Sequence, residues 1–353
     1  MVNCLHPVEA WICGNKPCKS DGVISPNLVF SKAKAIAYFF SHAPSGDFFR
    51  SEAPILGRMR WVYRQLKECC VLMPCGKCAA CQIHKRKDMS TRLTHEASLY
   101  EHSCFVTLTY DDVNCPVTDK GNKTLCPSDV QKFVKRLRRH LEYIPKRKSD
   151  GRDHVDKVRY FAVGEYGSRT HRPHYHLIIF GWSPSDKVLF KTHNGKPVYR
   201  SPQLERLWKH GYSTISDVNP RVAKYCARYV TKKFARLEDV NTLKDIVPEF
   251  VLQSTRDGAI GAKWFDKYGA DACLVGYCTY RIDDKICKAA IPDYYWHRLR
   301  RRKLPVWLKC RDDKIAFIQS HKLPCDNYDV DALKREVDVY RDKMHREAYD
   351  EFF

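Results

Sequence analysis

Apolar and polar residues alternate with a period of two in the segment FVTLTY, residues 105–110. The segment is also rich in β-branched and aromatic residues, so it predicts a β-strand. Thr107 and Thr109 then share one face of this strand, and Val106 and Leu108 share the other. Three further runs predict strands bounded by glycines or turn residues: VRYFAVGEYG (158–167), HYHLIIFGW (174–182) and YSTISDV (212–218).

Segments with a helical period lie between and after these strands. In SDVQKFVKRLRRHLEY, residues 128–143, the apolar side chains form one stripe and basic side chains take much of the remaining surface. PQLERLW (202–208) and RVAKYCARYVTKKFARL (221–237) predict two more helices, the second with Asn219 and Pro220 at its start. Strands separated by helices of unequal length, with one strand pair joined by a short turn, predict an α+β fold with a largely antiparallel sheet.

The character of the sequence changes twice along the chain. The first 90 or so residues are rich in Cys and Pro and show no regular period, whereas the period becomes regular from there to about residue 240. The last stretch alternates short helical and extended patterns. These changes predict a Cys-rich N-terminal segment (1–90), a central α+β domain (91–240) and a mixed C-terminal accessory region (241–353) whose role the sequence does not indicate.

The charge of the chain favours a polyanionic partner. Lys and Arg total 62 against 41 Asp and Glu, which gives a net charge of +21. Nucleic acid is the simplest such partner, since basic side chains that neutralise phosphates release counterions, although a solvated basic surface is the alternative. We expect neither secretion nor membrane insertion, because the start MVNCLHPVEAW is unlike a leader and no apolar run approaches 18 residues. The 17 cysteines are then reduced thiols or metal ligands.

Two histidines stand at the mouth of a predicted strand. In HRPHYH, residues 171–176, His174 and His176 fall on one side of the strand, close enough for their imidazoles to bind one ion. Glu165 lies near the end of the preceding strand and would return to the same face if the two strands form a hairpin, adding an oxygen ligand. A pair of surface histidines with a surface carboxylate is the alternative.

Two tyrosines are four residues apart on the last predicted helix. Tyr225 and Tyr229 therefore present their phenols on one helix face. An aromatic stripe in the core would explain this spacing, but the helix is also strongly basic, which suits a phosphate and a phenolate. Its basic residues are Arg221, Lys224, Arg228, Lys232 and Lys233.

Three cysteines form a Cys-x-x-Cys-x-x-Cys motif at Cys75, Cys78 and Cys81. The motif predicts a structural zinc site, for which tetrahedral Zn²⁺ needs one more ligand. Buried small thiols are the alternative, and an iron–sulfur cluster has only the number of thiols in its favour. The candidates for the fourth ligand are Cys4, His6, Cys69, Cys70 and His84. The basic run that follows, with Lys85 and Arg86, would contact phosphates or form a solvated surface.

The order of these motifs resembles the His-hydrophobic-His (HUH) superfamily of rolling-circle replication initiators. FVTLTY is followed by the block GEYG…RPHYHLIIFG and then by a helix with Tyr-x-x-x-Tyr and two lysines. The chain looks most like the replication initiators of the Microviridae, in particular the gokushovirus branch, which the segments CLHP, PCGKCxxC and TRLTHEASLYEHSCFVTLTY also resemble. The resemblance covers nearly the whole chain and is densest from about 70 to 235. It implies an HUH endonuclease core with a five-stranded central sheet flanked by helices.

The resemblance also implies a mechanism. His174, His176 and Glu165 match ligands of Mg²⁺ or Mn²⁺, while Tyr225 and Tyr229 match nucleophiles that form a 5′-phosphotyrosyl bond at a nicked single-stranded DNA origin. The free 3′-OH then primes rolling-circle replication, and the unit-length strand is rejoined. Lys232 and Lys233 would lie near the phosphate, with Arg221, Lys224 and Arg228 as further DNA contacts. The implied setting is the host bacterial cytoplasm, with the host helicase and polymerase as partners.

Three other functions fit parts of the sequence. A related HUH transposase or relaxase would share the site but not the production of a unit-length circle. A noncatalytic zinc-dependent DNA-binding protein would explain the charge and the cysteines, yet it leaves the histidines and tyrosines without a role. A metal-dependent hydrolase that uses water would form no covalent adduct with DNA.

Overall fold

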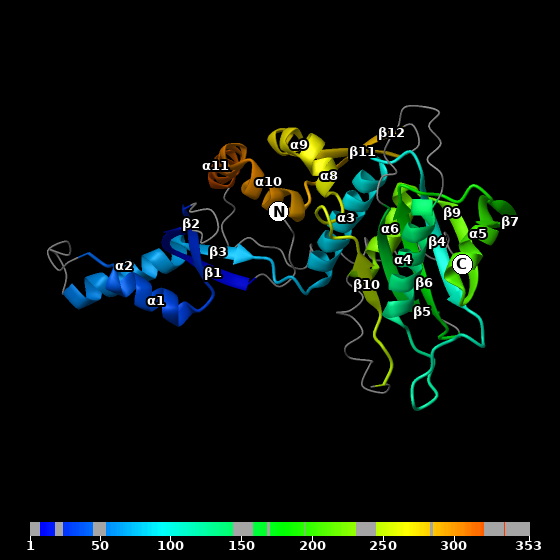
Figure 1. Cartoon of the computed structure of the whole chain (residues 1–353). Helices are drawn as coiled ribbons and strands as arrows, with labels where there is room; N and C mark the ends of the chain where they lie inside the picture. Colours follow the sequence, from blue (N-terminus) through cyan, green and yellow to red (C-terminus); the bar gives the residue numbers. More distant parts are fainter. Residues whose placement is uncertain are drawn as a thin grey trace. The chain divides into compact units, whose positions relative to one another are not determined.

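The computed structural model describes residues 8–17, 24–44, 54–143, 158–167, 170–193, 195–230, 245–282, 285–320 and 335. The chain divides into two compact units, Met1–His84 with Asn327–Val339, and Lys85–Asp326 with Tyr340–Phe353 (Figure 1). The three-part division expected from the sequence stays a prediction. Within the described ranges, no helix has both the length and the apolar character that crossing a bilayer requires.

The first unit contains a three-stranded antiparallel sheet in the order β2-β1-β3. Trp11, Phe39 and Val62 are buried in its small core. This differs from the irregular segment expected from the sequence, because the strands are short and β1 shifts register between Ile12 and Asn15, which interrupts any period of two. The elements are β1 (Val8–Pro17), β2 (Ile24–Val29), α1 (Lys32–Ser41), α2 (Pro54–Glu68) and β3 (Cys70–Met73).

A sheet in the order β10-β5-β6-β4-β9-β8-β7 forms the centre of the second unit, and all its neighbouring strands are antiparallel. The expected α+β class is confirmed, but the expectation of five strands is wrong, since the sheet has seven. The Asn-Gly pair at 194–195 is a turn signal for a further hairpin that was not predicted above. The strands are β4 (Ser103–Tyr110), β5 (Arg159–Tyr166), β6 (Pro173–Phe180), β7 (Val188–His193), β8 (Lys196–Arg200), β9 (Gly211–Asp217) and β10 (Phe250–Gln253).

Helices pack on both faces of this sheet, and alternate residues of β6 serve the two sides. Leu177 and Ile179 belong to a core that includes residues of α4 (Pro127–Tyr143) and α5 (Pro202–Trp208). Ile178 and Phe180 belong to a second core that includes residues of α3 (Ala79–Ala97) and α6 (Pro220–Ala227). Because successive residues of a strand point to opposite faces, His176 shares the α3 and α6 face, whereas Tyr175 lies in the α4 and α5 core.

The chain beyond the sheet builds a third core around Trp264, Tyr295 and Leu299. His95 of α3 stacks on Trp264 with 3.6 Å between ring centroids, and its Nδ1 lies 3.0 Å from the Tyr295 hydroxyl. The elements of this part are α8 (Ala262–Trp264), a π-helical turn (Phe265–Gly269), α9 (Ala270–Val275), β11 (Cys278–Ile282), β12 (Lys285–Ala289), α10 (Asp293–Arg302) and α11 (Leu304–Ser320).

A buried ion pair joins α3, β5 and the loop after β10. Arg159 Nε lies 2.6 Å from Glu96 Oε1, and both side chains are almost fully buried. The other carboxylate oxygen of Glu96 accepts the Gly261 N–H at 2.6 Å. Arg159 also donates to the carbonyls of Arg256 at 2.6 Å and Gly258 at 2.9 Å. Each charge is therefore compensated inside the protein, as a buried charge requires.

We expect Glu96→Gln to lower the free energy of unfolding by about 3–5 kcal/mol, because it leaves the buried guanidinium of Arg159 without an opposite charge. Urea unfolding followed by circular dichroism measures this change. Glu101→Gln is the matched control, since its side chain is exposed and its exposed pair should contribute no more than about 1 kcal/mol. Equal losses in the two variants would contradict this role of the ion pair.

Burial lowers the pKa of His95 to about 4, although the Thr279 carbonyl favours the charged form. An unfolded histidine titrates near pH 6.5, so the stability from a neutral His95 is complete above that pH and is lost as the pH falls towards 4. We expect a total loss of about 3 kcal/mol from this residue. Urea unfolding at pH 7 and pH 5 should show a clearly smaller pH dependence for His95→Phe, and an unchanged dependence would refute the assignment.

Candidate active site

The pairing of β5 with β6 places the candidate ligands on one face of the sheet. Glu165 is the direct partner of His174, and Thr107 of β4 is the direct partner of His176. Directly opposed residues point to the same face, so these side chains form two adjacent rows. The hairpin that Glu165 needs in order to meet the histidines is therefore present.

Three side chains converge on this face. The Nε2 atoms of His174 and His176 lie 2.8 Å and 3.2 Å from the same atom, Glu165 Oε1. Glu165 is 5% exposed and His176 9%, and one ligand atom of each of the three residues lies within 4.8 Å of the others. Two imidazoles and a carboxylate in this arrangement could hold a divalent metal ion.

The outer contacts of the histidines decide which nitrogen faces the carboxylate. His174 Nδ1 lies 3.1 Å from the Arg172 carbonyl, which can only accept, so Nδ1 carries the proton and donates it. The neutral ring then presents the lone pair of Nε2 to a carboxylate oxygen, and two acceptors at this distance need a cation or a further proton between them. His176 Nδ1 lies 3.1 Å from Thr107 Oγ1, which holds that ring in turn. Such outer partners are typical of metal-binding histidines.

The tyrosine pair lies against the same set of residues. Asn219 caps α6 by accepting the Val222 N–H at 3.0 Å, and the helix carries Tyr225 with its hydroxyl 3.1 Å from His176 Nε2. Tyr229, just beyond the helix end at Ala227, donates to the Tyr225 hydroxyl at 2.8 Å. Both tyrosines are 7% exposed. The structure thus brings the phenols and the candidate ligands together, as expected from the sequence.

The ionisation of these groups follows from burial and charge. Burial opposes ionisation of Glu165, but its hydrogen bonds with His174 and His176 outweigh this and hold the pKa of its carboxyl well below the usual range. Burial and the charge of Glu165 raise the pKa of Tyr225. Burial, Tyr225 and Glu165 likewise raise the pKa of Tyr229. Both phenols therefore stay protonated, and a positive charge among the three ligands would favour their ionisation.

The basic residues expected to bind DNA lie on α3 and α6. On α6 and directly after it, Arg221 is exposed, and Lys224 and Arg228 are partly exposed; Lys85 and Arg86 of α3 are partly exposed. Desolvation and the charge of Lys224 lower the pKa of Lys87, so the basic run of α3 lies within electrostatic reach of α6. Lys232 and Lys233 lie outside the described residues.

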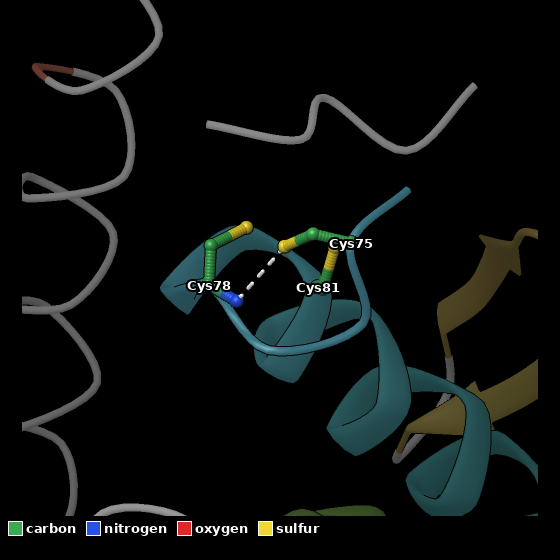
Figure 2. Close-up of side chains that lie close together, drawn as sticks. All are labelled: Cys75, Cys78 and Cys81. Atoms are coloured by element: carbon green, nitrogen blue, oxygen red, sulfur yellow. Dashed lines mark hydrogen bonds between the residues drawn. The ribbon is translucent and has the colours of Figure 1, made fainter. Parts of the chain in front are cut away.

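The cysteine motif forms a second candidate metal centre. The sulfurs of Cys75, Cys78 and Cys81 all lie within 4.8 Å of one another, as Figure 2 shows. Of the proposed fourth ligands, Cys4 and His6 lie outside the described residues. Cys69, Cys70 and His84 are described but do not join this set.

Two partners of the histidines, Thr107 and the Arg172 carbonyl, were not predicted from the sequence. The period of FVTLTY did place Thr107 and Thr109 on one face of their strand. The missing information was the neighbour of that strand, because strand order depends on tertiary packing and not on the period of the segment itself.

Residues 103–234 match the family model of the replication-associated protein ORF2. The chain is 30% identical over 262 residues to the replication-associated protein VP4 of Bdellovibrio phage phiMH2K, a match that covers 72% of this chain and 78% of that protein. It is 30% identical over 236 residues to the replication-associated protein ORF2 of Spiroplasma virus 4, covering 65% and 68%, respectively. It is 31% identical over 211 residues to the replication-associated protein ORF4 of Chlamydia phage 1, covering 58% and 49%. No solved structure matches.

We expect His174→Ala to weaken Mn²⁺ binding by more than about 100-fold, because it removes a candidate ligand, whereas losing an outer partner typically costs about 10–100-fold. Thr107→Val keeps the shape of the side chain and should fall in that smaller range. Isothermal titration of Mn²⁺ into the protein measures both effects.

His171→Asn is the matched control. His171 is an exposed histidine on the approach to the same strand, and its φ of 49° is one that Asn tolerates. Its Mn²⁺ affinity should equal that of the wild type. Unchanged affinity in His174→Ala would show that these residues do not hold the ion.

Proposed function

This chain belongs to the replication-associated protein ORF2 family of the Microviridae, and we propose that it is an HUH endonuclease that nicks and rejoins single-stranded DNA at a phage replication origin. DNA is the partner that family membership implies. The observation that carries the proposal is the Tyr225 hydroxyl, 3.1 Å from a nitrogen of His176 within a set of residues suited to a divalent ion. A strongly basic chain and the basic residues of α6 also support it.

Glu165, His174 and His176 would hold Mg²⁺ or Mn²⁺. The donor set fits such an ion, since an ionised carboxylate and an outward-facing imidazole lone pair meet at one point. A divalent ion bound there supplies a Lewis acid that polarises a phosphate oxygen. Thr107 and the Arg172 carbonyl keep the two imidazoles oriented towards that point.

Tyr225 is the nucleophile in the proposed reaction. Its phenolic oxygen forms a bond to the phosphorus of the scissile phosphate, the bond from phosphorus to the 3′ oxygen breaks, and the proton lost by the phenol ends on that oxygen. The products are a 5′-phosphotyrosyl bond and a free 3′-OH for the host polymerase. Because the covalent link preserves the energy of the phosphodiester, rejoining needs no nucleotide cofactor.

Tyr229 provides a second phenol for the second cleavage. One tyrosine would hold the parent end while the other cuts the newly made copy, whose 3′-OH then closes the unit-length circle. We assign the first cleavage to Tyr225, because it contacts His176 directly, whereas Tyr229 contacts the Tyr225 hydroxyl.

DNA would approach along the basic residues of α3 and α6. Lys85, Arg86, Arg221, Lys224 and Arg228 supply phosphate contacts, which position the strand without reading its sequence. Lys232 and Lys233 would lie near the scissile phosphate. The proposed setting is the cytoplasm of the bacterial host, where a host helicase and polymerase continue replication from the 3′-OH.

A covalent adduct that survives SDS tests the nucleophile. With origin-bearing single-stranded DNA and Mn²⁺, we expect Tyr225→Phe to lower the rate of first cleavage by at least about 1,000-fold, because removing a nucleophile removes the main route of catalysis. Tyr229→Phe should still form the adduct but should yield few unit-length circles. The double variant should form no adduct. Gel electrophoresis of labelled DNA measures all three.

Tyr212→Phe is the control, because this tyrosine of β9 is 58% exposed, and it should react as the wild type does. An adduct in the double variant would show that the nucleophile lies elsewhere. Cleavage without any adduct in the wild type would identify a hydrolase that uses water. Adduct formation without unit-length circles would favour a transposase or relaxase.

A further inference from the structure

We propose that Cys75, Cys78 and Cys81 bind a single zinc ion as thiolates. This site is separate from the nicking reaction and does not depend on that proposal. The three sulfurs converge although the residues are spaced along a loop and the start of a helix, and all lie within 4.8 Å of one another (Figure 2). Cys81 is buried, and the other two are partly buried.

Backbone N–H groups already point at one of these sulfurs. Cys75 Sγ accepts the N–H of Lys77 at 3.4 Å and the N–H of Cys78 at 3.3 Å, the second of which is drawn in Figure 2. Two N–H donors on one sulfur stabilise its charged form, which is the form that binds metal. The turn that aims them needs Gly76, whose φ of 73° lies in the left-handed region.

The helix side of the loop is fixed as well. α3 begins at Ala79, directly after Cys78, and brings Cys81, which is 3% exposed, beside the other two thiols. Gln82 ties the helix back to the loop, since its side chain donates to the Lys77 carbonyl at 2.9 Å and its backbone N–H donates to the Cys78 carbonyl at 3.0 Å. The positive end of the helix dipole also favours thiolates in this first turn.

The spacing of the sulfurs selects a single ion. Tetrahedral Zn²⁺ with bonds of about 2.3 Å holds its thiolates about 3.8 Å apart, which lies within the 4.8 Å limit seen here. In a four-iron cluster the cysteines bind different iron atoms, so their sulfurs stand farther apart than on one ion. Thiolates are soft ligands that prefer zinc or Cu(I) to Mg²⁺ or Mn²⁺. Zinc is the choice because it takes three thiolates and one more ligand without redox chemistry.

The bound ion would fix the first turn of a helix that reaches the sheet. α3 continues to Ala97, and Met89 and Leu93 on its later turns belong to the core that also contains Tyr225. Without a metal, three thiolates this close would repel one another, so the loop would open unless the sulfurs were protonated. The ion is therefore expected to stabilise the start of α3.

Metal analysis of the purified full-length chain tests the proposal. We expect about one zinc per chain, and Cys75→Ser and Cys81→Ser should each weaken zinc binding by more than about 100-fold, the upper cost of losing only an outer partner. Cys287→Ser is the matched control, since this cysteine is likewise partly buried but lies on β12, and it should keep its zinc. Zinc content that is equal in all variants would overturn the proposal.

Cobalt substitution in the wild-type chain gives a readout that does not depend on how the variants fold. Co²⁺ should give the intense visible bands of a tetrahedral site together with a near-ultraviolet charge-transfer band from thiolate. A weak octahedral spectrum, or iron and sulfide in stoichiometric amounts, would overturn a single-zinc site. Neither readout involves DNA cleavage, so failure of the nicking proposal leaves this test unaffected.

Discussion

The meeting of Glu165 with two imidazoles on one face of the sheet is the constraint on which the candidate active site depends. A hydrogen bond at Nδ1 holds His174 so that its Nε2 lone pair faces an ionised oxygen. Acceptors at this distance are stable only with positive charge between them, either a proton or a metal ion. A one-residue slip of β6 would move both histidines to the opposite face, so the strand register and the chemistry are fixed together.

The apolar surroundings of the site hold it rigid and also set a requirement for catalysis. Ile178 and Phe180 continue the histidine face of β6 into the core that contains Tyr225 and Tyr229. The Tyr225 hydroxyl occupies the position beside His176 Nε2 where an ion and a phosphate would have to enter. Ion binding must therefore displace this hydrogen bond. The same displacement would separate the phenol from Glu165, which raises its pKa, and bring it towards a positive charge.

Local pattern predicted much of this arrangement, and tertiary packing decided the rest. The alternation in β4 and the His-x-His spacing fixed which side chains share a face, and the four-residue spacing aligned the phenols. The hairpin β7–β8 and the four-residue strand β10 were not predicted, the first although an Asn-Gly signal marks its turn and the second because it is too short to show a period. Thr107 as a partner of His176 could not be predicted, because nothing in either segment specifies its neighbour.

The two candidate metal centres differ in ligand chemistry, and this difference keeps them independent. Nitrogen and oxygen ligands accept Mg²⁺ and Mn²⁺, but zinc binds such ligands more tightly than either ion, so affinity alone would not reserve the His and Glu site for a hard cation. Three thiolates favour zinc far more strongly than two imidazoles and a carboxylate do. A chain with both sets would therefore fill its cysteine site at low zinc concentration. The excess of magnesium in a cell would then be available to the catalytic residues.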